Sequence, residues 1–280
     1  RRAGLMIKVL SENTAASGKF EYEHGLSLYV ETDKHRLLFD TGAGGLFAEN
    51  AARMSVDISA VDIAVLSHGH YDHGGGLKTF LDKNGRANVY VHERAFEPHY
   101  SDRPNGTRAY IGLDADLLPN ERFVYCGKDF RIDEELELFS AVSEETPVPS
   151  GNAELYRKVG DDFLPDDFTH EQNLIIRQNG RALLIAGCAH RGIVNIVRQF
   201  KTDNGSFPDV VIGGFHLHSR GSGQSEAPEA VDAVARELKK TGARYYTCHC
   251  TGQEAYRRLK MILGNQIGYL SAGSRLAISM

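Results

Sequence analysis

The stretch that decides the fold is Ser67-His-Gly-His-Tyr-Asp-His-Gly-Gly-Gly76, which directly follows the apolar run Val61-Asp-Ile-Ala-Val-Leu66. A loop that opens off the end of a buried strand can hold ligands firmly and still leave coordination positions open for chemistry. Neutral imidazole suits zinc and similar borderline ions, and carboxylate suits harder ones. The alternative is a histidine-rich surface loop, but this spacing favours a metal site with four ligands: His68, His70, Asp72 and His73.

The pattern His68-x-His70-x-Asp72-His73 resembles the signature of the metallo-β-lactamase superfamily of binuclear metallohydrolases. The resemblance implies an α/β fold, the αββα four-layer sandwich in which two mixed sheets carry helices on their outer faces. It also implies two divalent metal ions as cofactors, zinc foremost, with iron or manganese as alternatives. Asp72 is then the expected catalytic residue, which orients the attacking water besides binding metal.

The segment His35-Arg-Leu-Leu-Phe-Asp-Thr-Gly42 resembles an early strand of the same superfamily, which ends in an aspartate, here Asp40. An ordinary turn would also explain Asp-x-Gly after a strand. Because ligating imidazoles need a partner for their other ring nitrogen, we expect Asp40 to support the metal site from behind the ligands.

The second half of the chain is expected to supply the remaining ligands. Where most members of the superfamily have a bridging aspartate, at the end of the strand Leu183-Leu-Ile-Ala186, this chain has Cys188. A thiol there either becomes a thiolate ligand or leaves one metal site weak. His190 follows two residues later and is the expected ligand. The alternative to His190 as this ligand is His170, which precedes Cys188 by eighteen residues.

Two further histidines follow predicted strands. His249 comes after Arg244-Tyr-Tyr-Thr247 and matches the final metal-ligand histidine of the superfamily. His216 comes after Gly213-Gly214, where small residues allow a ligand or another backbone segment to approach closely. We interpret His216 as a substrate-binding residue or an alternate ligand.

Three phrases, Gly187-Cys-Ala-His-Arg-Gly-Ile-Val-Asn195, Gly213-Gly-Phe-His-Leu217 and Cys248-His-Cys-Thr-Gly252, are similar to the dihydropterin ribofuranosylaminobenzene-phosphate synthase-like branch known from methanopterin biosynthesis. The first hypothesis is a metal-dependent hydrolase that uses metal-bound hydroxide on a small phosphate- or carboxylate-bearing substrate. The alternative that the branch implies is a transferase, in which an arylamine ribose phosphate displaces pyrophosphate. A third is a non-catalytic metal or redox-sensing binder, suggested by Cys188, Cys248 and Cys250.

Composition and charge agree with one catalytic domain over residues 1–280. The chain is 41% hydrophobic and 25% charged, with a net charge of -5 that favours neither nucleic acid nor an anionic membrane as a partner. No apolar stretch approaches the length of about eighteen residues that a membrane span needs. Four cysteines at this spacing predict no disulfide framework and indicate a reduced, cytoplasmic compartment. A small-molecule substrate is the expected partner. Composition does not indicate the oligomeric state.

Periodicity divides the chain into two similar halves, each with strands followed by helices. The expected strands are residues 6–9, 26–31, 36–39, 63–67, 89–91, 173–177, 182–186, 209–213 and 244–248, and the expected helices are 45–54, 75–84, 192–201, 227–241 and 253–261.

Residues 93–167 lie between the halves and hold six of the eight prolines. This density predicts a loop-rich segment that acts as a lid and selects the substrate, with a merely decorative insertion as the alternative. Within it, the residues of interest are Tyr100, Arg103, Arg108, Tyr110 and the run Ile111-Gly-Leu113. Of these, Arg108 and Tyr110 are the expected substrate-binding residues.

Overall fold

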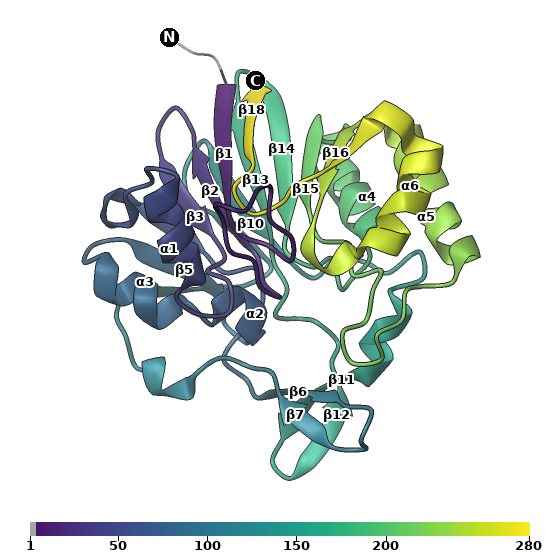
Figure 1. The fold of residues 1–280 in the computed structure, drawn as a ribbon, viewed down its shortest axis with the longest axis horizontal. Coiled ribbons are helices and arrows are strands. Elements are labelled where there is room, and N and C mark those ends of the chain that lie inside the picture. Colours follow the sequence, from purple (N-terminus) through teal and green to yellow (C-terminus); the bar gives the residue numbers. More distant parts are fainter. Residues whose placement is uncertain (1–3) are drawn as a thin grey trace.

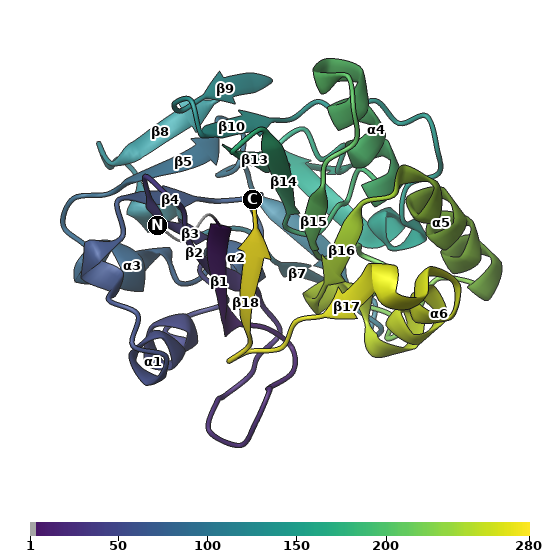
Figure 2. The same cartoon turned by 90° about the horizontal axis from the view of Figure 1, so that it is seen from above.

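Two seven-stranded sheets stack face to face in the computed structural model, which describes residues 4–280. Helices α1 and α3 cover the outer face of the first sheet, and α4, α5 and α6 cover the outer face of the second (Figures 1 and 2). The predicted αββα sandwich is therefore confirmed. In the described part of the chain, no helix combines the length and the apolar character needed to cross a membrane.

The first sheet has the order β18-β1-β2-β3-β4-β5-β8. It is mixed, because β18 to β3 pair antiparallel and β3 to β8 pair parallel. Its strands are β1 (Gly4–Ser11), β2 (Ser27–Glu31), β3 (Arg36–Phe39), β4 (Ile63–Val65), β5 (Asn88–His92), β8 (Phe123–Cys126) and β18 (Arg275–Ser279). Its helices are α1 (Leu46–Arg53), α2 (Tyr71–Gly74) and α3 (Leu77–Lys83).

The second sheet has the order β17-β16-β15-β14-β13-β10-β9 and is also mixed, with β14 to β17 parallel. Its strands are β9 (Asp129–Arg131), β10 (Leu136–Phe139), β13 (Asn173–Gln178), β14 (Arg181–Ala186), β15 (Val210–Gly213), β16 (Arg244–Thr247) and β17 (Ile267–Tyr269). Its helices are α4 (Ile193–Asn204), α5 (Pro228–Thr241) and α6 (Gln253–Leu263).

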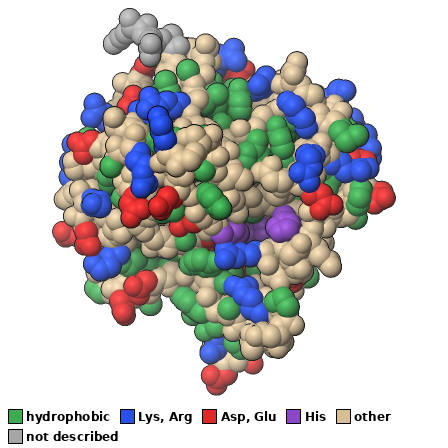
Figure 3. All heavy atoms as spheres, viewed as in Figure 1, with side chains coloured by type: hydrophobic (Ala, Val, Ile, Leu, Met, Phe, Trp, Pro, Cys, Tyr) green, Lys and Arg blue, Asp and Glu red, His purple; other side chains and the backbone are tan. Residues whose placement is uncertain are grey.

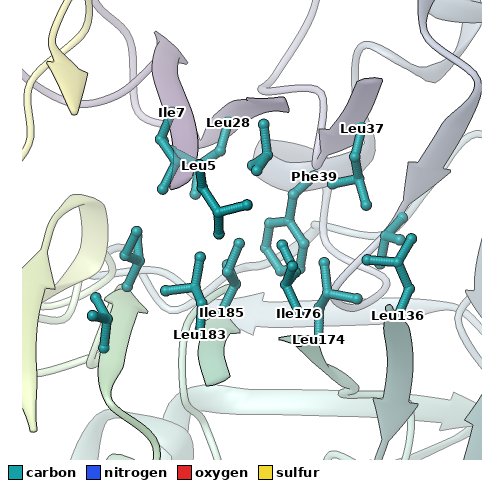
Figure 4. Close-up of a cluster of buried hydrophobic side chains, with 14 of the residues drawn as sticks. Leu5, Ile7, Leu28, Leu37, Phe39, Leu136, Leu174, Ile176, Leu183 and Ile185 are labelled. Carbon is teal, nitrogen blue, oxygen red and sulfur yellow. The ribbon is translucent and has the colours of Figure 1, made fainter. Parts of the chain in front are cut away.

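The core between the sheets follows from alternation along the strands. In β1, Leu5, Ile7 and Val9 are buried in this core, and in the facing strands Ile176 and Ile185 pack opposite them (Figure 4). Each fully buried aliphatic side chain of this kind contributes roughly 1.5–3 kcal/mol. The loops that carry the predicted ligands lie beyond the ends of these strands, so the core does not depend on the polar residues there.

Residues 93–167 contain seven short strands, which the prediction of a loop-rich segment did not include. Three of them, β8, β9 and β10, extend the two main sheets. The other four, β6 (His99–Asp102), β7 (Arg108–Tyr110), β11 (Leu155–Val159) and β12 (Asp162–Pro165), form a separate sheet at the bottom of Figure 1. Prolines are compatible with this arrangement because Pro98 precedes β6 and Pro165 ends the edge strand β12.

A histidine in the turn before β3 links the two main sheets. The His35 Nδ1 donates to Asp62 Oδ2 at 2.6 Å, just before β4, and its Nε2 donates to Asp133, between β9 and β10. Both ring nitrogens therefore carry hydrogens, which is the charged form of the ring. Burial opposes that charge, but the two carboxylates outweigh it and raise the pKa of His35 above its ordinary value.

We expect His35→Gln to lower the free energy of unfolding by about 1 kcal/mol at pH 6. A raised folded-state pKa gives stability that is complete below the ordinary value of 6.5 and lost as pH rises through the folded value. The difference between variant and wild type should therefore shrink by pH 9. Denaturant unfolding at both pH values measures it, with Lys34→Gln in the same turn as the control; a difference that does not change with pH would contradict the prediction.

Candidate metal centre

The polar side chains singled out in the sequence gather where strands of both sheets end. Asp40 follows β3 and His68 follows β4, which are parallel neighbours in the first sheet. In the second sheet, Cys188 follows β14 and His249 follows β16, on either side of β15. Parallel neighbours end at the same edge of a sheet, so residues far apart in the chain meet at one place.

Three histidines form the first group of candidate ligands. The ring centroids of His68, His70 and His190 lie 4.6 to 5.2 Å apart. The Nε2 atom of each ring is buried and has no hydrogen-bond partner within residues 4–280. A buried nitrogen without a partner costs about 1–3 kcal/mol, and three neighbouring ones are a donor set that a metal ion would satisfy. Burial holds the pKa of all three rings well below the ordinary value, and neutral imidazole is the metal-binding form.

Asp72, His73 and His249 form a second group beside the first. The Oδ2 atom of Asp72 lies 3.0 Å from His249 Nε2, and His73 Nε2 lies 3.1 Å from the same nitrogen. Burial opposes protonation of His73, but Asp72 and Asp40 outweigh it and raise its pKa to about 9. Metal binding at His73 would therefore release a proton.

Cys188 belongs to both groups. Its Sγ lies 3.0 Å from His73 Nε2. Its sulfur, with one ring nitrogen each of His68 and His190, forms a set of atoms within 4.8 Å of one another, and it forms a second such set with His73 and His249. The thiol thus occupies the shared position that the resemblance assigns to a bridging aspartate.

Asp40 stabilises the loop that carries the candidate ligands through hydrogen bonds to Ser67 and His73. Its Oδ1 accepts from the Ser67 N–H at 2.7 Å, and its Oδ2 accepts from the Ser67 hydroxyl at 2.7 Å and from His73 Nδ1 at 2.6 Å. The bond to Nδ1 turns His73 Nε2 toward the centre. The φ of Asp40 is 61°, a left-handed conformation that aspartate tolerates better than most residues.

The second half of the site is oriented in the same way. His190 Nδ1 donates to Asn152 Oδ1 at 3.0 Å, which leaves its Nε2 for the centre. His249 Nδ1 donates to Asn13 Oδ1 at 2.6 Å, and the backbone N–H of His249 donates to Glu12 Oε2 at 2.6 Å. Glu12 and Asn13 follow β1, and no spacing pattern in the sequence points to them.

His170 lies beside the centre, and both of its ring nitrogens are engaged. Its Nδ1 accepts from the Gly69 N–H at 2.9 Å, and its Nε2 donates to Asp166 Oδ2 at 2.9 Å. His99 stacks on it with centroids 4.0 Å apart and donates from Nδ1 to the Gly69 carbonyl at 2.8 Å. His170 and His99 therefore hold the backbone between His68 and His70, and of the two competing histidines only His190 presents a free nitrogen.

His216 forms part of the pocket wall next to the centre. Its ring lies 4.3 Å from that of His190, and neither of its ring nitrogens has a hydrogen-bond partner in the described structure. Its backbone N–H donates to Cys250 Sγ at 3.2 Å. With Cys188 and Cys250 it forms a third set of atoms within 4.8 Å, so its position is compatible with either predicted role.

The pocket over the centre is lined by residues of both halves and of the small sheet. Asp72, His190 and Cys188 lie in it, with His24, whose Nε2 is 3.2 Å from Asp72 Oδ2. Arg103, one of the residues singled out in the sequence, and Arg220 also line it, and sequence reasoning missed Arg220 and His24. A single basic residue in a loop has no spacing that could have revealed it.

Arg108 and Tyr110, expected to bind substrate, do not line this pocket. The β6–β7 pairing places Arg108 opposite Asp102, and the two form an ion pair at 3.1 Å. The Arg108 guanidinium also stacks over Tyr156, and the Tyr110 hydroxyl donates to the Leu113 carbonyl. These contacts occupy both side chains away from the pocket, which Arg103 and Arg220 line instead.

With this geometry established, comparison with known proteins identifies the family. The sequence profile of the metallo-beta-lactamase superfamily matches residues 22–230, and the chain belongs to this superfamily. A solved structure described as Tm1679, a metal-dependent hydrolase of the beta-lactamase superfamily, is 28% identical, covers 99% of this chain and 100% of its own, and superposes with a TM-score of 0.83.

Two relatives come from Methanocaldococcus jannaschii. The protein MJ0448 is 30% identical over 98% of this chain and 100% of its own length. The organism's 7,8-dihydropterin-6-methyl-4-(beta-D-ribofuranosyl)-aminobenzene-5'-phosphate synthase is 27% identical over 90% of this chain and 89% of its own. Membership of the superfamily and likeness to this synthase support a metal-dependent hydrolase or a synthase-like role.

Proposed function

We propose that this protein is a metal-dependent hydrolase of a small anionic substrate. The observation that carries the proposal is the set of three buried histidine Nε2 atoms without partners, His68, His70 and His190, beside Asp72, His73 and His249. In this proposal the first three would hold one divalent ion and the second three another. Cys188 would lie between them, because its sulfur groups with His68 and His190 on one side and with His73 and His249 on the other. Imidazole and thiol ligands favour zinc, with iron or manganese as alternatives.

Bound divalent ions would supply Lewis acidity and would lower the pKa of water, which makes a nucleophile available near neutral pH. The chain's own residues prepare the site for this chemistry. Asp40, Asn152 and Asn13 orient the ligand rings through their other nitrogens. Asp72 faces the pocket and is the proposed residue that orients the attacking water.

The pocket supports a small substrate selected in part by residues 93–167. Ser101 and Arg103 lie at the end of β6, and Glu154 and Leu155 lie at the start of β11; all four line the pocket. This segment thus forms a wall over the centre, which agrees with the proposed selecting role. Arg103 and Arg220 favour a substrate that carries a phosphate or carboxylate group.

Likeness to the synthase favours a second candidate, transfer in place of hydrolysis. In that reaction the carbon of an arylamine ribose phosphate would replace water as the nucleophile, and pyrophosphate would leave. The same ligand set would serve both reactions, so the two differ in acceptor and not in the metal centre.

We expect the chelator-treated protein to be inactive and the addition of zinc to restore hydrolysis of anionic phosphodiesters and esters in preference to neutral esters. Turnover against that panel tests hydrolysis, and pyrophosphate release that depends on an arylamine acceptor tests transfer. Rates that survive complete removal of metal, or equal rates on neutral and anionic esters, would refute the proposed hydrolase.

A further inference from the structure

Two arginines lie on one wall of the pocket although they come from separate segments. Arg103 follows β6, and Arg220 lies in the loop between β15 and α5. The segments meet at Gly221, where an added Cβ would lie 3.1 Å from the Asp102 carbonyl oxygen and 3.6 Å from Ser101 Oγ. Because Gly221 adjoins Arg220 and Asp102 adjoins Arg103, the two arginines come from backbone segments that touch, and both line the pocket.

Neither guanidinium forms an ion pair with any carboxylate of residues 4–280. Other arginines of the small sheet are paired: Arg108 with Asp102, and Arg157 with Glu97 at 3.6 Å. The pocket carboxylate Glu154 instead accepts from the Ser219 hydroxyl at 2.6 Å. Two arginines without a carboxylate partner therefore line one pocket, beside the carboxylates of Asp72 and Glu154, and both can bind an anionic group of a substrate.

Both arginines lie close to the candidate metal centre. They line the same pocket as Asp72, Cys188 and His190. On the face shown in Figure 3, histidine side chains lie in a hollow with basic side chains beside them.

We propose that Arg103 and Arg220 together bind a phosphate monoester group that the substrate carries away from its reacting bond. The inference rests on the proposed function and narrows its substrate class from anions in general to phosphate monoesters. A carboxylate has one charge and two oxygens, which a single guanidinium satisfies in a bidentate pair. A phosphate monoester has nearly two charges and three free oxygens, and so it matches two guanidinium groups.

The test is calorimetric titration of the zinc-loaded protein with phenyl phosphate and with benzoate. We expect Arg103→Met and Arg220→Met each to weaken phenyl phosphate binding by about tenfold to a hundredfold. Arg157→Met, which removes a paired arginine of the same small sheet, should bind it as wild type does. Metal content should be equal in all variants, because no arginine is among the candidate ligands.

Phenyl phosphate binding that neither substitution weakens would overturn the inference. Benzoate binding that depends on both arginines as strongly as phenyl phosphate binding does would also overturn it, because the site would then not be specific for phosphate. Arginine-dependent binding in a protein that hydrolyses nothing would support the phosphate site and refute only the hydrolase. Metal-dependent hydrolysis with arginine-independent phosphate binding would support the hydrolase and overturn the phosphate site.

Discussion

His68→Ala and His73→Ala are each expected to remove metal and to lower metal-dependent turnover on the order of a thousandfold or more. His68 belongs to the first candidate group and His73 to the second, and alanine offers no atom to an ion. The secondary structure should remain, because both side chains lie beyond the strand ends and outside the core between the sheets.

Metal analysis, turnover and circular dichroism of both variants test this expectation. His92→Gln is the control, because His92 is a buried histidine at the end of β5 that belongs to none of the candidate ligand groups. It should keep its metal. Full metal content with unchanged turnover in both alanine variants would exclude the assigned centre, whereas loss of secondary structure would show that the metal is structural.

The candidate ligands could be predicted where they follow a strand or share a short spacing. Four of them fall within six residues: His68, His70, Asp72 and His73. His249 directly follows a predicted strand. The strands and helices near them were also predictable, because apolar periodicity sets them: the expected strand 36–39 coincides with β3.

Residues that reach the site through tertiary contact could not be predicted. Asn13 and Glu12 orient His249 across more than two hundred positions of sequence. Arg220 lies in the pocket wall beside the end of β6, which its loop touches at Gly221. The prolines of residues 93–167 predict a loop-rich segment but do not reveal the strands within it, because Pro98 and Pro165 stand at strand ends. Local signals of this kind carry no information about which distant segment a strand will join.

The position of Cys188 explains how this chain departs from the usual pattern of its superfamily. Its sulfur contacts His73 from the end of β14 and belongs to both candidate groups, while the backbone N–H of His216 donates to the neighbouring Cys250. Burial raises the pKa of the Cys188 thiol well above its ordinary value. An ion that uses this sulfur must therefore displace a proton, which a carboxylate would not require near neutral pH.

Cys188→Asp is expected to raise the affinity for the second ion by about tenfold or more, because an ionised carboxylate can bridge two cations. The same carboxylate should destabilise the metal-free protein, since it would be buried where Cys188 is only 3% exposed. The rise in melting temperature on adding zinc should therefore be larger in the variant than in wild type.

Metal titration by calorimetry measures the affinity for the second ion. Cys188→Ala should bind that ion more weakly than wild type. Cys248→Ser is the matched control, because Cys248 lies in the core between the sheets and in none of the candidate ligand groups. If Cys188→Asp and Cys188→Ala both bind metal with the stoichiometry and affinity of wild type, the thiol is a packing residue and the shared position must belong to another group.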